Sequence, residues 1–339
     1  MVPRTKTKGA ARLPSARLGE NHGIALVAPD SFKGTFTAPV VAGALARGLR
    51  AGGVDAVELP VADGGEGTMD ALLDALGGER RTAKVSDPLG RPVKAEFGLL
   101  PDGTGVVETA EASGLRLVAE GKRDAWSAST RGTGELIAAA ARAGARKVIL
   151  GVGGSATTDG GAGALEALGG VEVELDVVCD VQTPWEDAPR VFGPQKGADP
   201  ETVARLEHRL DELADSAPRD PRGVPMTGCA GGLSGGLWAF RGARLLPGAA
   251  YVLDAVGFDE RLREAAFVVT GEGALDEQTL AGKVVAEVAE RCRAAGVPCH
   301  AVVGKNRLAA GRLPLASITE ATTLAAIEAA GRALTERKA

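Results

Sequence analysis

The sequence predicts an α/β protein in which both ends of the chain build one doubly wound parallel sheet and the middle forms a second, inserted α/β domain. Three observations support this. At 339 residues the chain is long enough for about two domains. Its first eighty residues and its last third alternate short apolar runs, glycine-bearing loops and helical segments, as parallel sheets with covering helices do. The middle has short extended runs joined by tight turns, which is typical of an antiparallel meander.

The N-terminal alternation begins with an apolar run at Ile24–Val27. Thr37 offers an N-cap and Pro39 suits the first turn of a helix, which we expect to reach Arg50 and stop at Gly52 and Gly53. A second strand at Val57–Val61 and a helix at Thr68–Leu76 follow. The order is therefore strand, helix, strand, helix.

The middle begins with three extended runs, at 82–85, 93–99 and 105–109. A helix at Thr133–Ala143 and a strand at Val148–Val152 come next, followed by a glycine-rich loop. Residues 170–178 alternate apolar and acidic residues with period two, which predicts one extended strand. An amphipathic helix is expected at 200–215.

The last third returns to the first pattern, with strands at Phe267–Thr270 and Ala301–Val303 and helices at Val284–Ala295 and Thr322–Leu334. We therefore expect residues 23–80 and 245–339 to form the doubly wound domain and residues 81–244 to form the insertion. Residues 1–22 lack an apolar core segment and read as a disordered extension, with a targeting segment as the alternative.

Composition excludes several classes of protein. The net charge is −5 and aromatic residues are only 3%, which argues against nucleic acid as a partner. No apolar run approaches the ~18–20 residues of a membrane span. The four cysteines form no CxxC pair and are expected to be buried thiols in a reducing cytoplasm.

Polar, glycine-rich loops follow the expected strands and carry the candidate site. Ligands of such sheets bind where strands end, and glycine lets backbone N–H groups approach an anion. Carboxylates in the same loops can bind Mg²⁺ or accept a proton, and isolated lysines can neutralise phosphate. Together these groups are typical of sites for phosphoryl transfer. The loops are Ala28–Thr35, Val61–Thr68, Gly151–Gly163, Cys179–Val181, Phe192–Asp199 and Thr270–Thr279.

Each loop also has a purely structural interpretation. The loop Gly151–Gly163 could be a tight turn, and Asp63 and Glu66 could complement a helix dipole. Lys283 could be an ordinary first-turn lysine. The stretch Gly228–Trp238 reads as close packing, whereas Lys196 has the weakest structural explanation.

Taken together, the loops resemble the bacterial glycerate kinases of the type that includes the glycolate- and galactarate-pathway enzymes. Eight blocks match in order: APDSFKG, PVADGGEGT, ASGL, GTGELI, GGSATTDGGAG, CDV, VFGPQKGA and TGEG…D.QT..GK. The resemblance covers about residues 24–304. It implies two α/β domains, one Rossmann- or flavodoxin-like, with a site between them. It also implies ATP-dependent phosphorylation of D-glycerate at the 2-hydroxyl, giving 2-phosphoglycerate, with 3-phosphoglycerate as the alternative product.

With this resemblance we expect direct in-line transfer, with Asp180 as the base ahead of Asp30. Lys33 and Lys196 neutralise phosphate, and Arg131 or another basic group holds the substrate carboxylate. The full candidate set is as follows: catalytic Asp180, Lys196 and Asp30; phosphate-binding Ser31, Lys33, Gly64, Gly65, Gly153, Gly154, Ser155 and Lys283; substrate-binding Arg131, Thr133 and Asp159; and Mg²⁺-binding Asp63, Glu66 and Glu272.

The chain departs from the family pattern in three places. Only nine residues, 170–178, stand where the family has a few tens, the loop before Phe192 is short, and Arg131 replaces a more usual aromatic residue. We expect the short span to give a more open cleft and weaker or broader substrate binding. The alternatives are a kinase for a related hydroxy acid and a non-catalytic binding protein. The sequence is silent on oligomeric state.

Overall fold

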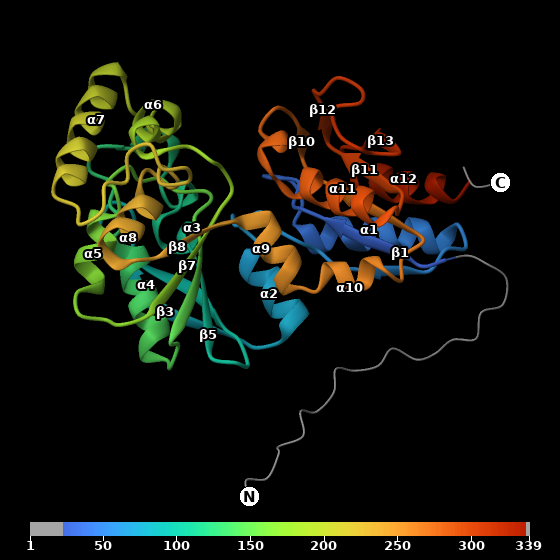
Figure 1. The fold of residues 1–339 in the computed structure, drawn as a ribbon, viewed down its shortest axis with the longest axis horizontal. Helices are drawn as coiled ribbons and strands as arrows, with labels where there is room; N and C mark the ends of the chain where they lie inside the picture. The colour runs from blue at the N-terminus through green and yellow to red at the C-terminus, as the bar shows by residue number, and fades with distance from the viewer. Residues whose placement is uncertain (1–22, 337–339) are drawn as a thin grey trace, which may run out of the picture.

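The structure, a computed structural model, describes residues 23–336, so the expectation for residues 1–22 lies outside the described part (Figure 1). Two separate sheets organise the described chain, one of five strands and one of six. This arrangement confirms the predicted fold class. No helix among the described residues is long and apolar enough to cross a membrane.

The five-stranded sheet is wholly parallel and has the order β13-β11-β9-β1-β2. The strand β2 lies on one side of β1, and β9, β11 and β13 lie on the other side. The strand order therefore reverses between β1 and β9, which is the switch point of the sheet. The bounds are β1 Ala25–Pro29, β2 Ala56–Glu58, β9 Phe267–Gly271, β11 Cys299–Val303 and β13 Ser317–Glu320.

Helices cover both faces of this sheet, because alternate strand residues are apolar on either side. On one face α1 (Ala38–Ala51) packs closely on α12 (Leu324–Glu336). A Cβ atom on Gly48 would lie 1.9 Å from the Glu328 carbonyl oxygen, which explains that glycine. The other face contacts α11 (Val284–Ala295). A small two-stranded piece, β10 (Ala274–Leu275) and β12 (Lys305–Asn306), lies beyond the strand ends.

The six-stranded sheet has the order β3-β4-β5-β6-β7-β8. The first three strands form the predicted antiparallel meander, and β5 to β8 are parallel. The bounds are β3 Glu79–Ser86, β4 Pro92–Leu99, β5 Thr104–Glu108, β6 Lys147–Gly151, β7 Glu174–Cys179 and β8 Arg244–Pro247. One face packs on α4 (Arg131–Arg142), α5 (Ala162–Leu168) and α8 (Leu233–Arg241).

The predicted strand over 170–178 is partly wrong. The strand β7 begins only at Glu174, and it continues to Cys179. Its expected polar face is also incomplete, because Asp176 is buried and binds Arg244 through two hydrogen bonds of 2.6 and 2.7 Å and Lys147 at 2.7 Å. The neighbouring strands β6 and β8 supply both cations, so this acid is paired inside the sheet.

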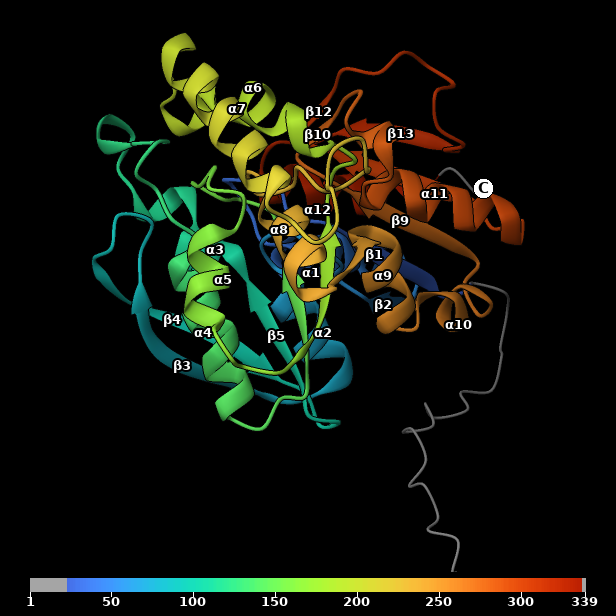
Figure 2. The ribbon, with the colours of Figure 1, turned by 60° about the vertical axis from the view of Figure 1, so that its left-hand side comes forward.

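Two helices lie between the sheets and join them (Figures 1 and 2). The helix α2 (Thr68–Leu76) contacts β4 and β5, and α9 (Gly248–Ala255) contacts β7, β8 and α2. One continuous apolar core runs through this layer from Leu26 of β1 to Val106 of β5. The short helix α10 (Phe258–Leu262) follows α9. The two sheets therefore share a core, which fixes the loops at their facing edges.

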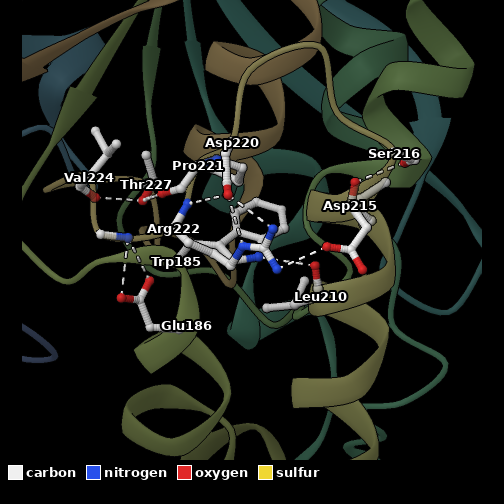
Figure 3. A network of polar contacts seen from close by, with 12 residues as sticks. Trp185, Glu186, Leu210, Asp215, Ser216, Asp220, Pro221, Arg222, Val224 and Thr227 are labelled. Carbon is white, nitrogen blue, oxygen red and sulfur yellow. Dashed lines mark hydrogen bonds and ion pairs between the residues drawn. The ribbon is translucent and has the colours of Figure 1, made fainter.

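A helical segment after β7 lies over the end of the six-stranded sheet. It contains 3₁₀ turns at Trp185–Asp187 and Pro194–Lys196 and the helices α6 (Ala188–Phe192) and α7 (Pro200–Asp215). Figure 3 shows how the segment is tied together: the Trp185 indole donates to the Leu210 carbonyl at 3.1 Å, and Arg222 pairs with Asp215 at 3.0 Å. The short helix α3 (Thr109–Ser113) and 3₁₀ turns at Leu115–Leu117, Glu120–Lys122 and Thr279–Ala281 complete the described elements.

The stretch Gly228–Trp238 packs closely, as its glycines suggest. A Cβ atom on Gly231 would lie 2.0 Å from the Thr157 carbonyl oxygen, and one on Gly236 would lie 2.0 Å from that of Gly160. These glycines therefore let α8 approach the loop before α5, and close packing accounts for them.

Candidate active site

The carboxyl ends of β1 and β9 bring acids and lysines together at the switch point of the parallel sheet. Asp30 and Ser31 follow β1, Glu272 follows β9, and the loop after β2 adds Asp63. The Lys33 ammonium lies 3.2 Å from Asp63 Oδ2. The structure thus gathers side chains from three predicted loops where ligands of such sheets bind.

Two cavities meet at Lys33. The first, of about 460 Å³, lies at the switch point and is called the switch-point cavity; it is lined by Asp30, Ser31, Phe32, Lys33, Thr35, Glu272, Gly273, Ala274, Asp276, Lys283, Gly304, Lys305 and Thr322. The second, of about 610 Å³, lies between the sheets and is called the inter-sheet cavity. Its lining includes Lys33, Phe36, Pro39, Pro60, Glu66, Met69, Arg80, Glu108, Arg116, Gly153 and Gly154. Lys33 therefore stands in the wall of both.

Asp180 enters the site from the six-stranded sheet, directly after β7. A Cβ atom on Gly153 would lie 3.6 Å from Asp180 Oδ2, so this carboxylate borders the glycine loop after β6. Burial and then the nearby Asp63 carboxylate raise the pKa of Asp180, while Lys33 and Lys283 act in the opposite direction. Asp180 thus shares its electrostatic surroundings with residues of the parallel sheet.

The acids of the parallel sheet are held in a similar environment. Burial raises the pKa of Asp30 well above its ordinary value, and the Asp63 carboxylate adds to the effect. Burial also raises the pKa of Glu272 to about 7, against a 2.7 Å hydrogen bond that the Thr279 hydroxyl donates to it. For Lys33, partial desolvation lowers the pKa, but Asp63, Asp30 and Asp180 outweigh this and raise it, so the amine stays charged. Lys33, together with Lys283 at Asp180 and Glu272, therefore offsets several crowded acids.

These carboxylates fit Mg²⁺ in the company of phosphates. Among the described residues, no three His, Cys, Asp or Glu side chains converge on a preformed metal site. Mg²⁺ in kinases, however, takes one or two carboxylates and completes its shell with substrate phosphates and water. Asp30, Asp63 and Glu272 offer buried oxygens that repel one another, which a bound cation would relieve. The predicted ligand Glu66 lines the inter-sheet cavity instead, where it pairs with Arg116 at 3.0 Å.

The glycines of two predicted phosphate loops touch each other. A Cβ atom on Gly153 would lie 2.6 Å from the Gly65 Cα, and one on Gly64 would lie 2.7 Å from the Val178 carbonyl oxygen. The loop after β2 therefore needs glycine in order to approach both the loop after β6 and strand β7. This is a structural reason for these glycines that stands beside any role in binding phosphate.

We expect Gly153→Ala to separate these loops. The new methyl group meets backbone atoms of Gly65, so the fold should lose about 1–3 kcal/mol of stability. Activity should fall further than stability alone explains, because the loop after β2 carries Asp63, the partner of Lys33, and the loop after β6 borders Asp180. Thermal melting and turnover measure the two effects, with Gly170→Ala as the control, since a Cβ atom there has nothing within 4 Å. A variant that melts and turns over like the parent would contradict the contact.

Lys196 is buried and fully engaged by the glycine loop after β6. Its ammonium, in a side chain that is 2% exposed, donates to Ser155 Oγ at 3.0 Å and to the Thr157 carbonyl at 2.6 Å. Burial lowers its pKa to about 7, against Asp159, Cys229 and Asp180. Like Asp63 and Asp180, Lys196 is not among the residues that line the two cavities. Its contacts support a role in fixing the loop, and the predicted role on phosphate stays a prediction.

Three predicted substrate-binding residues lie away from the cavities. Arg131 pairs with Glu166 at 2.7 Å and Glu135 at 3.2 Å on the surface of α4 and α5. The Thr133 hydroxyl donates to Ser113 Oγ at 2.8 Å, and it is buried. Asp159 accepts from Thr130 at 2.8 and 2.9 Å and from the backbone of the α5 N-terminus. These side chains have their partners on the helices and loops that pack on the six-stranded sheet. None of them is among the residues that line the two cavities at Lys33.

Glu108 is a buried acid of the inter-sheet cavity that the sequence analysis missed. It ends β5 and is 6% exposed, and it accepts from the backbone N–H groups of Gly67 at 3.0 Å and Met69 at 2.8 Å. It thereby holds the start of α2 and the end of the loop that carries Asp63. An acid directly after an apolar run, as in Gly105–Glu108, was the available signal.

Glu108→Gln should change how stability depends on pH. Burial raises the pKa of Glu108 to about 7 from an ordinary value of 4.5, so the folded protein holds this proton more tightly than the unfolded chain. The stability that this tightly held proton gives the folded protein is fully present below pH 4.5. It is lost as pH rises to about 7, by up to roughly 3 kcal/mol. Urea unfolding between pH 4.5 and 8 should show this loss in the parent and not in the variant. The exposed Glu264→Gln serves as control, and an equal slope in all three proteins would refute the assignment.

Comparison with known proteins agrees with this arrangement. The sequence profile of the glycerate kinase family matches residues 25–172 and 171–338. A glycerate kinase from Bacillus subtilis is 41% identical over 324 residues, which covers 82% of this chain and 84% of the relative. The glycerate 2-kinase of Escherichia coli K12 is 40% identical over 311 residues, covering 78% and 82%.

A solved structure extends the agreement to the fold. The crystal structure of a candidate glycerate kinase 2 from Salmonella typhimurium LT2 matches with a TM-score of 0.79 and 34% identity, covering 94% of this chain and 98% of that chain. The sequence blocks, the two-sheet fold and the profile match all agree. The chain belongs to the glycerate kinase family.

Proposed function

We propose that this kinase transfers the γ-phosphoryl group of ATP to the 2-hydroxyl of D-glycerate, giving 2-phosphoglycerate and ADP. The observation that carries the proposal is Lys33, which stands in the wall between two cavities of different character. A transferring phosphoryl group passes between donor and acceptor, and a cation at the junction stabilises its charge throughout.

The nucleotide phosphates belong in the switch-point cavity. Ligands of doubly wound sheets bind at the carboxyl ends of strands where the strand order reverses, and here that point lies between β1 and β9. The cavity carries Lys33, Lys283 and Lys305 for phosphate oxygens. Asp30, Asp63 and Glu272 would hold Mg²⁺ there, which supplies charge neutralisation for the phosphates when bound.

Glycerate then occupies the inter-sheet cavity, on the other side of Lys33. Its hydroxyl oxygen forms the new bond to the γ-phosphorus while the bond from that phosphorus to the β,γ-bridging oxygen breaks and ADP leaves. The hydroxyl proton passes to Asp180, whose raised pKa brings it closer to the operating pH than an ordinary aspartate.

The experiment is a coupled assay of ADP release with D-glycerate, with and without Mg²⁺, followed by NMR identification of the phosphorylated carbon. We expect Mg²⁺-dependent turnover and 2-phosphoglycerate. No ADP above background with a folded sample rejects the proposal, and 3-phosphoglycerate rejects the regiochemistry alone.

A related hydroxy acid is the second candidate substrate. The inter-sheet cavity, at about 610 Å³, is spacious for a three-carbon acid. The shortened span 170–178 is consistent with such openness. Bulkier hydroxy acids in the same assay decide between the candidates by their kcat/KM values.

We also propose that residues 23–80 with 245–339 and residues 81–244 act as the two domains around the cleft. The cytoplasm, which supplies ATP, is the proposed location. The domain proposal predicts that ligands of the two cavities bind more tightly together than apart, which calorimetry with ADP and glycerate measures.

A further inference from the structure

The arginines near the candidate site differ in how their guanidinium donors are used. Arg131, on the surface of α4, binds two carboxylates, Glu135 and Glu166. Arg80, in the inter-sheet cavity, also binds two, Asp70 and Glu96. An arginine fork has five N–H donors, and in each of these residues two different nitrogens are already directed at carboxylates. A further anion would therefore have to share the guanidinium with two acids.

Arg116, also in the lining of the inter-sheet cavity, has one carboxylate partner. Its Nη1 lies 3.0 Å from Glu66 Oε2, and its side chain is 72% exposed. Among the described residues, Glu66 is the one acid paired with this guanidinium. The same protein shows, at Arg131, that a guanidinium accommodates a second carboxylate beside the first. Arg116 therefore has an open position for an acid.

The backbone around Arg116 is tied to the glycine loop of the site. The preceding residue, Leu115, donates its N–H to the Gly154 carbonyl at 2.9 Å, and Gly114 forms a bridge with Ser155. Gly153 and Gly154 line the same cavity, and a Cβ atom on Gly154 would lie 3.1 Å from Glu66 Oε1. The base of the Arg116 side chain is thus fixed next to the loop that borders Asp180.

We propose that Arg116 binds the carboxylate of the substrate acid and so makes the enzyme select hydroxy acids over neutral alcohols. This proposal rests on the placement of glycerate in the inter-sheet cavity. The carboxylate takes the open side of the guanidinium, with Glu66 on the other side. The hydroxyl end of the acid is then directed toward Lys33 and Asp180. Arg116 replaces Arg131 in the role that the sequence analysis gave to a basic group.

The first test is calorimetric binding of D-glycerate without nucleotide, to the parent and to Arg116→Met. A hydrogen-bonded charge pair accounts for a factor of roughly 10–100 in affinity, so the variant should bind glycerate that much more weakly. Arg116→Lys keeps the charge but not the fork and should recover part of the loss. Arg293→Met is the matched control, because Arg293 is also exposed and has one glutamate partner, Glu290, but lies on α11.

The second test compares steady-state kinetics with D-glycerate and its neutral amide. In Arg116→Met the KM for glycerate should rise by roughly 10–100-fold, while kcat/KM for the amide and the KM for ATP stay within about twofold. Because the side chain is exposed, melting temperatures should match the parent.

The two proposals fail in different ways. Equal glycerate binding by the parent and Arg116→Met overturns the role of Arg116 whether or not turnover is seen. Absence of measurable glycerate binding by the parent overturns it as well. Binding that depends on Arg116 without any ATP-dependent turnover supports the role of Arg116 and rejects the kinase reaction on glycerate.

Discussion

Asp180→Asn is expected to lower kcat by roughly 10²–10⁴-fold, which is the usual contribution of a positioned general base. Asparagine keeps the shape of the side chain and cannot accept the hydroxyl proton. The KM for glycerate should change little, because Arg116 rather than Asp180 binds the acid. Steady-state kinetics with saturating ATP and Mg²⁺ measure the effect.

The same reaction should have an acidic limit set by this group. Burial and Asp63 raise the pKa of Asp180, and the base must be unprotonated, so activity falls as pH drops through that raised value. In Asp180→Asn the residual activity should no longer fall at acidic pH, so the acidic limb of the pH–rate profile should be absent. The competing base is Asp30, which is buried and accepts the Ser31 N–H at 2.6 Å. If Asp30→Asn removes the limb and Asp180→Asn retains it, the roles are reversed.

The sequence predicts the fold class because its signals are local. Apolar runs, glycine stops and tight turns each involve neighbouring residues, and they correctly predicted the doubly wound sheet and the meander of β3 to β5. The position of α2 depends on both sheets at once. Its apolar residues, such as Met69 and Leu72, pack in a core shared with β1 and β5, which no local pattern reveals.

The candidate site could be predicted from the sequence where its residues directly follow the carboxyl ends of strands. Asp30, Asp63 and Glu272 are gathered because parallel strands end at one edge. Arg131 is a candidate because an arginine fork matches the shape of a carboxylate. Its actual partner, Glu166, lies on another helix, and only the packing of α4 on α5 brings the two together. Glu108 and Arg116 needed the same kind of long-range information.

Lys33→Met is expected to lower kcat/KM by roughly 10²–10³-fold, since a preorganised cation at the junction of two cavities stabilises the charge of the transferring group. The side chain is 57% exposed, so the change leaves no cavity, but the buried Asp63 loses its ion-pair partner and some stability should be lost. A second effect should accompany the first. Lys33 lowers the pKa values of Asp30, Asp180 and Glu272, and its loss leaves these acids protonated at higher pH.

The acidic limb of the pH–rate profile should therefore move to higher pH in Lys33→Met, and Lys33→Arg should keep it near the parent's position because the charge remains. Profiles of kcat/KM between pH 5.5 and 9 separate the two contributions, with the exposed Lys94→Met as control. A uniform loss of rate without movement of the limb would show that Lys33 acts on the phosphoryl group alone. An unchanged rate would show that Lys33 takes no part in the reaction, because a cation between donor and acceptor must change the energy of the phosphoryl charge that is transferred.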